Sequence, residues 1–429
     1  MDTIAIAEKW QRFVAADNKQ RVRLFVRKLI YLLILKPLAF LLHLVLHLIS
    51  LGRPVRIGTL IAKGKISIMI SYIEPYMRQL RLEGVRNPLV VVINPGKCPN
   101  EQLSRMYGRA VQLLDDRHPR LRRLFSFLLR LLAASGSRTV AHLQGADFTP
   151  YLRAWGEGGP VLRFTPEERE RGQHLLAQMN MSAGVTYICF GLREAAFYQQ
   201  FLTPESLARY TNPEDRENTY IRNPPLQNYL PMAAHCAEQG LYVLRMGQVA
   251  GEPLPSGLHP NIIDYAMKYR TSFGDVYLLA NCKFVVAGVA GLWWIATAFN
   301  RPIVMSDSPT LHLGAGLRNG DLFIPKKVWV IAEKRLLTFP EMLKADIRYS
   351  YEDNCHRDGM ELVHNTPEEI AAVVSEMNRR LDGTWSPSDE DEDLQRRFKE
   401  MLFSYQHPKS YGLPVRIGAE FLRQHADLL

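Results

Sequence analysis

The sequence predicts an α/β protein with two Rossmann-like lobes, preceded by an N-terminal helical segment that associates with a membrane. Its 429 residues are more than one hydrophobic core usually serves, so two domains are expected. Short β-branched runs alternate with helical patterns across glycine-bearing turns, which is typical of parallel sheets covered on both faces. An unusually apolar stretch lies ahead of this alternation.

Composition and charge narrow the class of protein. Lysine and arginine number 53 against 43 acidic residues, a net charge of +10, and the excess gathers in basic runs at 19–28 and 117–123. Such a concentration of positive charge is expected in a protein that binds an anionic membrane or an anionic ligand, and also on an ordinary solvated surface. Nucleic acid is not expected, because only one aromatic residue, Phe25, is interleaved in these two runs. The five cysteines form no CxxC pair, which argues against a structural zinc and fits a reducing cytoplasm.

The first region, residues 1–84, is basic and helical and contains the apolar segment 29–52. This segment reads LIYLLILKPLAFLLHLVLHLISLG and is just long enough to cross a bilayer core. Lys36 and Pro37 near its middle, and basic residues at both ends, favour a kinked hairpin or an in-plane anchor on anionic lipid. A buried core helix is the alternative. We therefore expect a cytoplasmic protein, peripherally or monotopically associated with the inner membrane.

The elements that follow predict two lobes. The first lobe, 85–183, has a strand at 88–94 and helices at 102–114, 121–134 and 165–179. The last helix opens with good capping chemistry, Thr165-Pro166-Glu167-Glu168. The second lobe, 184–385, alternates strands at 185–192, 242–246, 262–264, 284–287 and 302–305 with helices at 229–239, 273–280 and 292–299. Residues 386–429 read as an acidic loop, 387–393, and a short helix that packs back on the first lobe.

The expected strand ends of the second lobe carry cations and small residues, at the place where such sheets bind ligands. A glycine-bearing turn that opens a helix presents free N–H groups, which suit a phosphate. Arginines that point to the same place bind a diphosphate and replace a divalent metal when the leaving group departs. No metal or cofactor site is predicted. The expected phosphate-binding residues are Arg193, Arg222, Arg245, Gly247, Ala290 and Gly291.

These residues also carry a family resemblance. The order G-L-R-E, Y-I-R-N, R-M-G, I-D-Y-A and A-G-L resembles a bacterial glycosyltransferase family of surface-polysaccharide gene clusters. The second lobe of that family typically reads H-x-R-D, R-N, R-M-G, D-Y and S-G-L. N-E-Q-L-S-R-M-Y-G-R within 94–109 and R-I-G-A-E-F-L at 416–422 look similar to its other signatures. The resemblance covers residues 85–425 and implies a GT-B-like fold, a donor held mainly by the second lobe, and no DxD metal site.

The sequence departs from the family pattern at three positions. Gly191 stands where histidine is usual, Glu194 where aspartate is usual, and Ala290 where serine is usual. Glu194 is the acid nearest the arginine turn and is the candidate catalytic residue, a general base for the acceptor hydroxyl. Its alternative role is an ion pair with Arg193.

Other side chains are candidates for the nucleotide or sugar of the donor. Asp264 is expected to orient hydroxyls, with Asn223 and Tyr265 beside it, although Asp-Tyr after a strand is also a common helix-entry device. Trp293 and Trp294 are expected to pack in a core or interface, with stacking on a base or sugar as the alternative.

The expected function is a hexosyltransferase-like enzyme. It moves a sugar from a nucleotide-sugar donor to a lipid-linked or polysaccharide acceptor at the cytoplasmic membrane face, without a metal. Two alternatives stay open. One is a polysaccharide pyruvyl transferase, which shares the two-lobed architecture. The other is a catalytically degenerate, membrane-associated protein that binds carbohydrate or nucleotide, which the lost histidine and serine favour.

Overall fold

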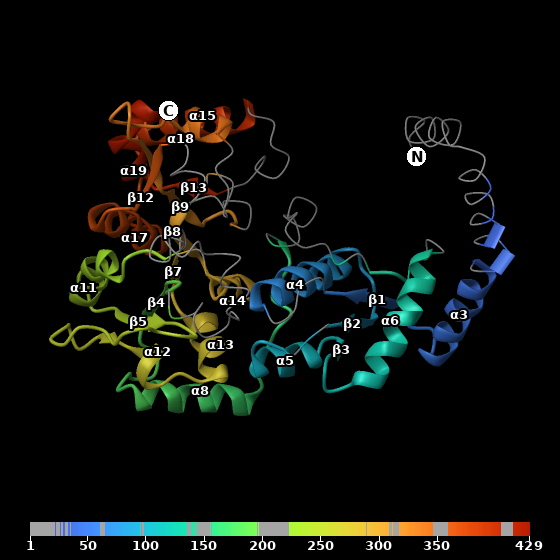
Figure 1. Ribbon diagram of the computed structural model, residues 1–429. Coiled ribbons are helices and arrows are strands. Elements are labelled where there is room, and N and C mark those ends of the chain that lie inside the picture. Colours follow the sequence, from blue (N-terminus) through green and yellow to red (C-terminus); the bar gives the residue numbers. More distant parts are fainter. Residues whose placement is uncertain are drawn as a thin grey trace. The chain divides into compact units, whose positions relative to one another are not determined.

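The computed structural model describes residues 36–60, 65–94, 98–134, 157–194, 223–288, 290–308, 317–345, 359–404 and 415–429, with a few single residues and short stretches between them. The chain divides into two compact units. Unit 1 comprises Met1–Gly64, Glu83–Cys98 and Gly108–Leu143; unit 2 comprises Lys65–Leu82, Pro99–Tyr107 and Gln144–Leu429. These bounds differ from the predicted limits at 84, 183 and 385. Both units contain a parallel sheet, which confirms the α/β class (Figure 1).

Unit 1 is a three-stranded parallel sheet in the order β1 (Val55–Thr59), β2 (Leu89–Ile93), β3 (Gln112–Leu114). The helix α6 (Pro119–Ala134) packs on all three strands and on α3 (Lys36–Ile49). The predicted strand at 88–94 and helix at 121–134 are therefore confirmed. The predicted helix at 102–114 is wrong in its second half. The helix α5 (Glu101–Gly108) stops earlier, and 112–114 satisfy their backbone groups in the ladder with β2.

The helix α3 leaves much of its apolar surface uncovered. Ala39, with Leu42 and Leu46, packs against the core of unit 1. Large apolar side chains on the rest of the helix are exposed: Leu38, Phe40, Leu41, Leu44, Val45, Leu48 and Ile49. The buried-helix alternative therefore fits only one face of α3. In the part of the chain that the structure describes, no helix combines the length and apolarity needed to span a membrane.

Unit 2 is built on a seven-stranded sheet in which every pair of neighbours is parallel. Its five inner strands are almost wholly buried, as expected where helices cover both faces. Their order is β13 (Arg416–Ile417), β9 (Leu322–Pro325), β8 (Ile303–Ser308), β7 (Val285–Ala287), β4 (Tyr187–Gly191), β5 (Tyr242–Met246) and β6 (Ile262–Ile263). The predicted strands of the second lobe are confirmed.

Helices cover the two faces of this sheet (Figure 1). On one face α11 (Leu230–Glu238), which follows a 3-10 turn at Leu226–Tyr229, packs against α17 (Pro367–Leu381). On the other face α13 (Ser272–Asn281) packs against α14 (Trp293–Ala298). The helix α8 (Pro166–Gln178) packs on α13, and α4 (Ile66–Leu82) packs on α14. Thr165 and Glu168 form the capping box expected at the start of α8.

A small antiparallel sheet, which the sequence did not predict, completes unit 2. Its order is β11 (Arg335–Leu336), β10 (Lys327–Val330), β12 (Met360–Val363), and the helix α15 (Phe339–Lys344) follows β11. Glu369 on α17 ties this sheet to the C-terminus, because it accepts hydrogen bonds from Lys327 and from His425 (2.7 Å). Burial opposes its ionised form, but these bonds and the N–H of Thr366 outweigh burial and lower the pKa of Glu369 to about 2.

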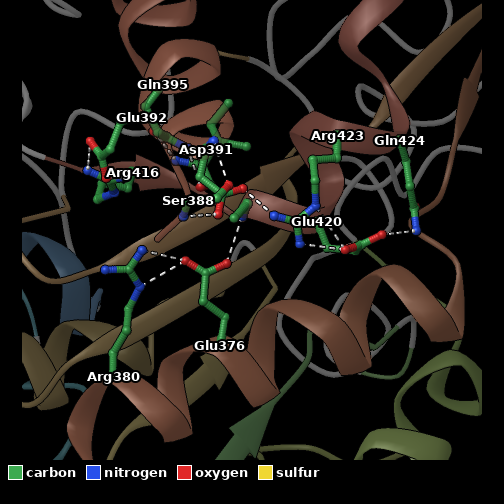
Figure 2. A network of polar contacts seen from close by, with 12 residues as sticks. Glu376, Arg380, Ser388, Asp391, Glu392, Gln395, Arg416, Glu420, Arg423 and Gln424 are labelled. Carbon is green, nitrogen blue, oxygen red and sulfur yellow. Dashed lines mark hydrogen bonds and ion pairs between the residues drawn. The ribbon is translucent and has the colours of Figure 1, made fainter. Parts of the chain in front are cut away.

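The predicted acidic loop at 387–393 is wrong, because α18 (Asp389–Ser404) begins inside it. Four acidic residues fill the first turn of α18, where the helix dipole favours negative charge. Two of them also pair with arginines that are distant in sequence: Asp391 binds Arg423, and Glu392 binds Arg416 at 2.6 Å (Figure 2). A local sequence pattern does not reveal such pairs.

The C-terminal segment belongs to unit 2. β13 pairs with β9, and α19 (Ala419–Gln424) packs on α17 and α18. Figure 2 shows Glu376 of α17 between these elements. Its carboxylate accepts a hydrogen bond from the Ala419 N–H (2.7 Å) and forms an ion pair with Arg380 (2.8 Å). The expectation of a helix directed back to the first lobe is therefore replaced by contacts within the second lobe.

Candidate functional site

The strand ends predicted to hold the ligand lie side by side in unit 2. Gly191 at the end of β4 is in register with Met246 of β5 and Ala287 of β7, and Ala287 is in register with Met305 of β8. Because the strands are parallel, the turns that follow them leave the sheet at one edge, which we call the carboxyl edge. The neighbouring turns after β4 and β7 contact each other, since the N–H of Gly288 donates to Gly191 O at 3.3 Å.

Three of the predicted site residues form one buried cluster at this edge. The Arg245 guanidinium, 2% exposed, donates to Glu194 Oε1 at 2.7 Å, to Asp264 Oδ2 at 3.3 Å and to the Glu252 carbonyl at 2.6 Å. The other Glu194 oxygen accepts the Gly251 N–H at 2.7 Å. The anticipated ion pair of Glu194 is thus made with Arg245. The cluster ties the turn after β4 to the turn after β5.

This geometry changes the roles that the sequence assigned to these residues. A guanidinium that faces two carboxylates is already neutralised, so Arg245 fits a brace between turns better than a phosphate ligand. Both carboxylate oxygens of Glu194 are likewise in use, which does not favour a general base. Asp264 serves as the N-cap of α12 (Tyr265–Lys268), accepting from Met267 N. The helix-entry alternative for Asp264 is therefore confirmed.

Tyr265 is a core residue. It is fully buried, and its hydroxyl lies 3.0 Å from the Thr271 carbonyl and 3.2 Å from Asp275 Oδ1. Burial, and after it the negative charge of Asp275, raise the pKa of Tyr265 far above its ordinary value, so the hydroxyl stays a donor. With its donor used inside the protein, this side chain has no group to offer a sugar or nucleotide.

The turn after β7 is the open part of the carboxyl edge. A β-carbon added at Gly291 would meet no atom within 4 Å, and one at Gly288 would meet Pro224 and Leu192 at ordinary contact distances of 3.4 and 3.7 Å. Ala290 belongs to the same turn, and its N–H donates to Gly288 O at 2.7 Å. The turn leads into α14, which has six residues. A β-carbon added at Gly247, after β5, would meet Ala266 at an ordinary contact distance of 3.5 Å.

Asn223 brings an unused amide to this neighbourhood. Its Nδ2 and Oδ1 atoms are both buried, and neither has a hydrogen-bond partner in the part of the chain that the structure describes. The next residue, Pro224, faces Gly288. A buried amide without partners is costly unless a ligand or water satisfies it. Arg193, the second residue after β4, is half-buried. Arg222, predicted to share this place, lies outside the described residues.

The tryptophans pack in the core, as expected. The Trp293 and Trp294 rings stack with centroids 4.3 Å apart, and Trp155 lies 6.2 Å from Trp294. Both rings of the pair are more than nine-tenths buried. Arg78 of α4 covers Trp155 at 4.8 Å. The alternative of stacking on a base or sugar therefore finds no support here.

The sequence did not single out Arg78 and Glu74, which fix α4 to the end of α14. Both side chains are fully buried and pair at 2.9 Å. Arg78 also donates to the Ala298 carbonyl and to Asn300 Oδ1, both at 2.7 Å. Burial raises the pKa of Glu74 and lowers the pKa of Arg78, and their mutual attraction opposes both shifts. The pair is an anchor for the helix that follows the β7 turn.

A second unpredicted cluster surrounds Asp307 in β8. Its carboxylate accepts from the Tyr229 hydroxyl at 2.9 Å and from the Asn365 N–H at 3.0 Å, and His364 Nδ1 lies 2.9 Å from it. Asp307 is 1% exposed and has a φ of 51°, in the left-handed region that non-glycine residues rarely adopt. The one local signal in the sequence was the polar run Ser306-Asp307-Ser308 at the end of an apolar strand.

One pocket lies among residues that were not predicted. It has a volume of about 200 Å³ and opens beside the N-terminus of α13, lined among others by Arg105, Arg171, Ser272 and Phe273. The Arg171 guanidinium stands 4.3 Å from the Phe273 ring centroid. None of the predicted site residues lines it, so it is separate from the candidate site at the carboxyl edge.

Comparison with known proteins gives weak similarities. No family model matches the chain, and no curated protein matches it. Among solved structures, ADP-heptose LPS heptosyltransferase II of E. coli is 14% identical, with a TM-score of 0.37 over 60% of this chain and 86% of that chain. A glycosyl transferase of family 9 from Veillonella parvula is 10% identical, with a TM-score of 0.35 over 59% and 80%.

The E. coli heptosyltransferase WaaC with ADP is also similar. It is 14% identical, with a TM-score of 0.34 over 63% of this chain and 90% of that chain. At such identities and TM-scores, the likeness assigns neither a fold nor an activity to this chain.

Proposed function

We propose that the protein is a glycosyltransferase that moves a sugar from a nucleotide-sugar donor to a lipid-linked or polysaccharide acceptor, without a bound metal, in a GT-B-like pair of lobes. The observation that carries the proposal is the carboxyl edge of the unit 2 sheet. There the turns after β4 and β7 meet, and the buried Asn223 amide has no hydrogen-bond partner among the described residues. Doubly wound parallel sheets bind nucleotides at this kind of edge.

The proposed reaction places charge where this edge has donors. The acceptor hydroxyl oxygen bonds to the anomeric carbon while the bond from that carbon to the diphosphate oxygen breaks. The diphosphate leaves with the electron pair, and the hydroxyl proton passes to the departing diphosphate. In this proposal Arg193 and the N–H of Gly291, at the open position of the turn after β7, stabilise the diphosphate, and the Asn223 amide contacts the donor. Arg245 and Asp264 hold the turns in place.

A second candidate is the degenerate protein that binds the same donor without turnover. One observation favours it: both oxygens of Glu194, the candidate base, already accept hydrogen bonds. A single experiment separates the two candidates. The full-length protein is incubated with EDTA and a panel of nucleotide sugars, with and without a bacterial membrane-lipid extract. Donor binding and the release of nucleoside diphosphate are both measured.

Release of diphosphate that depends on the extract supports the transferase. Binding without release supports the degenerate protein, and no binding of any donor contradicts both. The Arg193→Ala variant is expected to weaken donor binding about tenfold or more, as for a lost charge-assisted contact. Its control is Arg169→Ala on the exposed face of α8, which is expected to bind as the wild type does.

We further propose that α3 and the adjoining basic residues hold the enzyme at the cytoplasmic face of the inner membrane. The exposed apolar face of α3 supports this, with Leu121, Leu124 and Phe127 of the neighbouring α6 also exposed. Between Asp17 and Glu74 the sequence has no acidic residue, so α3 and the segments that flank it in the sequence carry only basic charges. Apolar side chains with basic flanks bind anionic lipid surfaces.

Vesicle binding tests this part of the proposal. The protein is expected to co-sediment with vesicles of phosphatidylglycerol and phosphatidylethanolamine more than with pure phosphatidylcholine. Leu44→Ser with Leu48→Ser should reduce binding without lowering the thermal midpoint, because both side chains are already exposed. Equal binding of this variant would contradict a role for α3.

A further inference from the structure

His364 is held at the carboxyl edge by the buried carboxylate of Asp307. The Asp307 Oδ1 atom lies 2.9 Å from His364 Nδ1, and Oδ2 lies 2.9 Å from the Tyr229 hydroxyl. Burial, followed by the charge of Asp307, raises the pKa of Tyr229 well above its ordinary value, so Tyr229 donates its proton in this contact. The carboxylate is thus fixed by three elements: β8, the start of α11 and the β12–α17 junction.

This arrangement sets the orientation of the imidazole. A carboxylate accepts, so Nδ1 carries the proton, and Nε2 of a neutral ring is left with its lone pair. The His364 side chain is 33% exposed. Among the described residues, none forms a hydrogen bond with Nε2. A ring fixed at one nitrogen and open at the other presents an acceptor to a ligand hydroxyl.

The position of this ring matches the proposed donor site. Ala287 of β7 is in register with Met305 of β8, and Asp307 follows two residues later. Neighbouring strands lie about 4.8 Å apart, so the Gly288 turn and Ser306 are direct neighbours at the carboxyl edge. The chain from Asn223 to Tyr229 runs along the same edge, with Pro224 against Gly288 and Tyr229 against Asp307.

The backbone of Asp307 is a further sign of function. Its φ of 51° lies near the end of the buried strand β8, where the register with β9 shifts between Met305 and Ser308. The conformation turns the Asp307 N–H to Asn365 Oδ1 at 2.7 Å, which locks β8 to the segment that carries His364. Strained backbone of this kind persists where the surroundings enforce it and is concentrated at functional sites.

We infer that His364 is a binding residue of the donor site, whose Nε2 accepts a hydrogen bond from a sugar hydroxyl of the nucleotide-sugar donor. Asp307 is its positioning residue, and Tyr229 fixes Asp307. The inference rests on the proposed function, because it assumes that the carboxyl edge binds a nucleotide sugar. The hydroxyl belongs either to the ribose or to the transferred sugar, which share this chemistry.

Paired substitutions separate this role from a purely structural one. In His364→Asn the amide nitrogen takes the place of Nδ1 and keeps the bond to Asp307, but nothing replaces Nε2. The thermal midpoint should then stay near that of the wild type. His235→Asn, at an exposed position on α11, is the matched control. Binding of ADP, UDP and GDP, and of ADP-glucose, UDP-glucose and GDP-mannose, is measured by calorimetry for each full-length protein.

We expect His364→Asn to bind the preferred nucleotide sugar about three- to tenfold more weakly, the loss of one hydrogen bond, and His235→Asn to match the wild type. Weaker binding of the nucleotide sugar alone places the contact on the transferred sugar, whereas equal weakening with the diphosphate places it on the ribose. Unchanged binding by His364→Asn overturns the inference and leaves the proposed function standing. A wild type that binds none of the six compounds overturns both.

Discussion

The buried cluster of Arg245, Glu194 and Asp264 gives the sharpest test of how the candidate site is held together. Arg245 is 2% exposed and is the cation shared by two carboxylates. Arg245→Met removes that charge and keeps most of the volume. Asp264 is then left 4% exposed with only backbone N–H groups as donors, from Leu254 at 2.9 Å and Met267 at 3.4 Å.

Removing one member of a buried ion pair typically costs about 3–5 kcal/mol, because the remaining charge stays desolvated. Glu194→Gln should cost less, about 1–2 kcal/mol, since Glu194 is 21% exposed and the amide can still receive one hydrogen bond from Arg245. In the double variant the two losses should not add, because the second substitution removes a contact that is already broken.

The assay is urea unfolding followed by far-UV circular dichroism, for the wild type, both single variants and the double variant. We predict the order of stability wild type, Glu194→Gln, Arg245→Met. A free energy of unfolding of Arg245→Met within about 1 kcal/mol of the wild-type value would show that Arg245 is not a brace between the turns. If that stable variant also failed to bind a donor, Arg245 would be a phosphate-binding residue, as the sequence alone indicated, and not a brace between turns.

Three further predictions concern the body of unit 2. The pKa of Glu369 in the folded protein is about 2, below its ordinary value of 4.5. The contribution of the Glu369 carboxylate to folding stability is therefore complete at neutral pH and is lost as the pH falls toward 2. From pH 7 to 3.5 the wild type should lose about 1 kcal/mol more stability than Glu369→Gln, and equal pH profiles would contradict this. Asp391→Asn should destabilise the protein by about 1–3 kcal/mol in urea unfolding, because the buried Asp391 carboxylate holds Arg423, whereas the exposed Asp389→Asn should change little. Replacing glycine by alanine within a helix normally stabilises it. In Gly172→Ala, however, the new β-carbon would lie 1.9 Å from the Tyr277 ring. A lower thermal midpoint is therefore expected, and a higher one would contradict the close packing of α8 on Tyr277.

The parts of the fold that sequence patterns predicted are those that local chemistry determines. The strand at 242–246 matches β5 residue for residue, and the helix predicted at 165–179 is α8 with its capping box. Parallel strands buried on both faces give continuous apolar runs, and caps depend on residues three positions apart. The short β3 was missed because three residues within a helical pattern carry no period of their own.

The candidate site was predicted less well, because its contacts join residues that are far apart in sequence. Sequence reasoning paired Glu194 with its neighbour Arg193, whereas the structure pairs it with Arg245, 51 positions away. His364 and Asp307 are 57 positions apart, and neither belongs to a motif that sequence reasoning used. The place of the site followed from strand order, but the partner of each side chain depends on the tertiary fold.

The most direct test of the central claim is to locate the bound donor. The full-length protein is labelled with a photoreactive nucleotide sugar whose unmodified form binds, and the labelled peptides are identified by mass spectrometry. We expect label in peptides that contain 191–194, 223–229 and 287–292, and we expect excess unmodified donor to suppress it. Specific label confined to the pocket beside Arg105 and Arg171, or to unit 1, would contradict a donor site at the carboxyl edge of the unit 2 sheet.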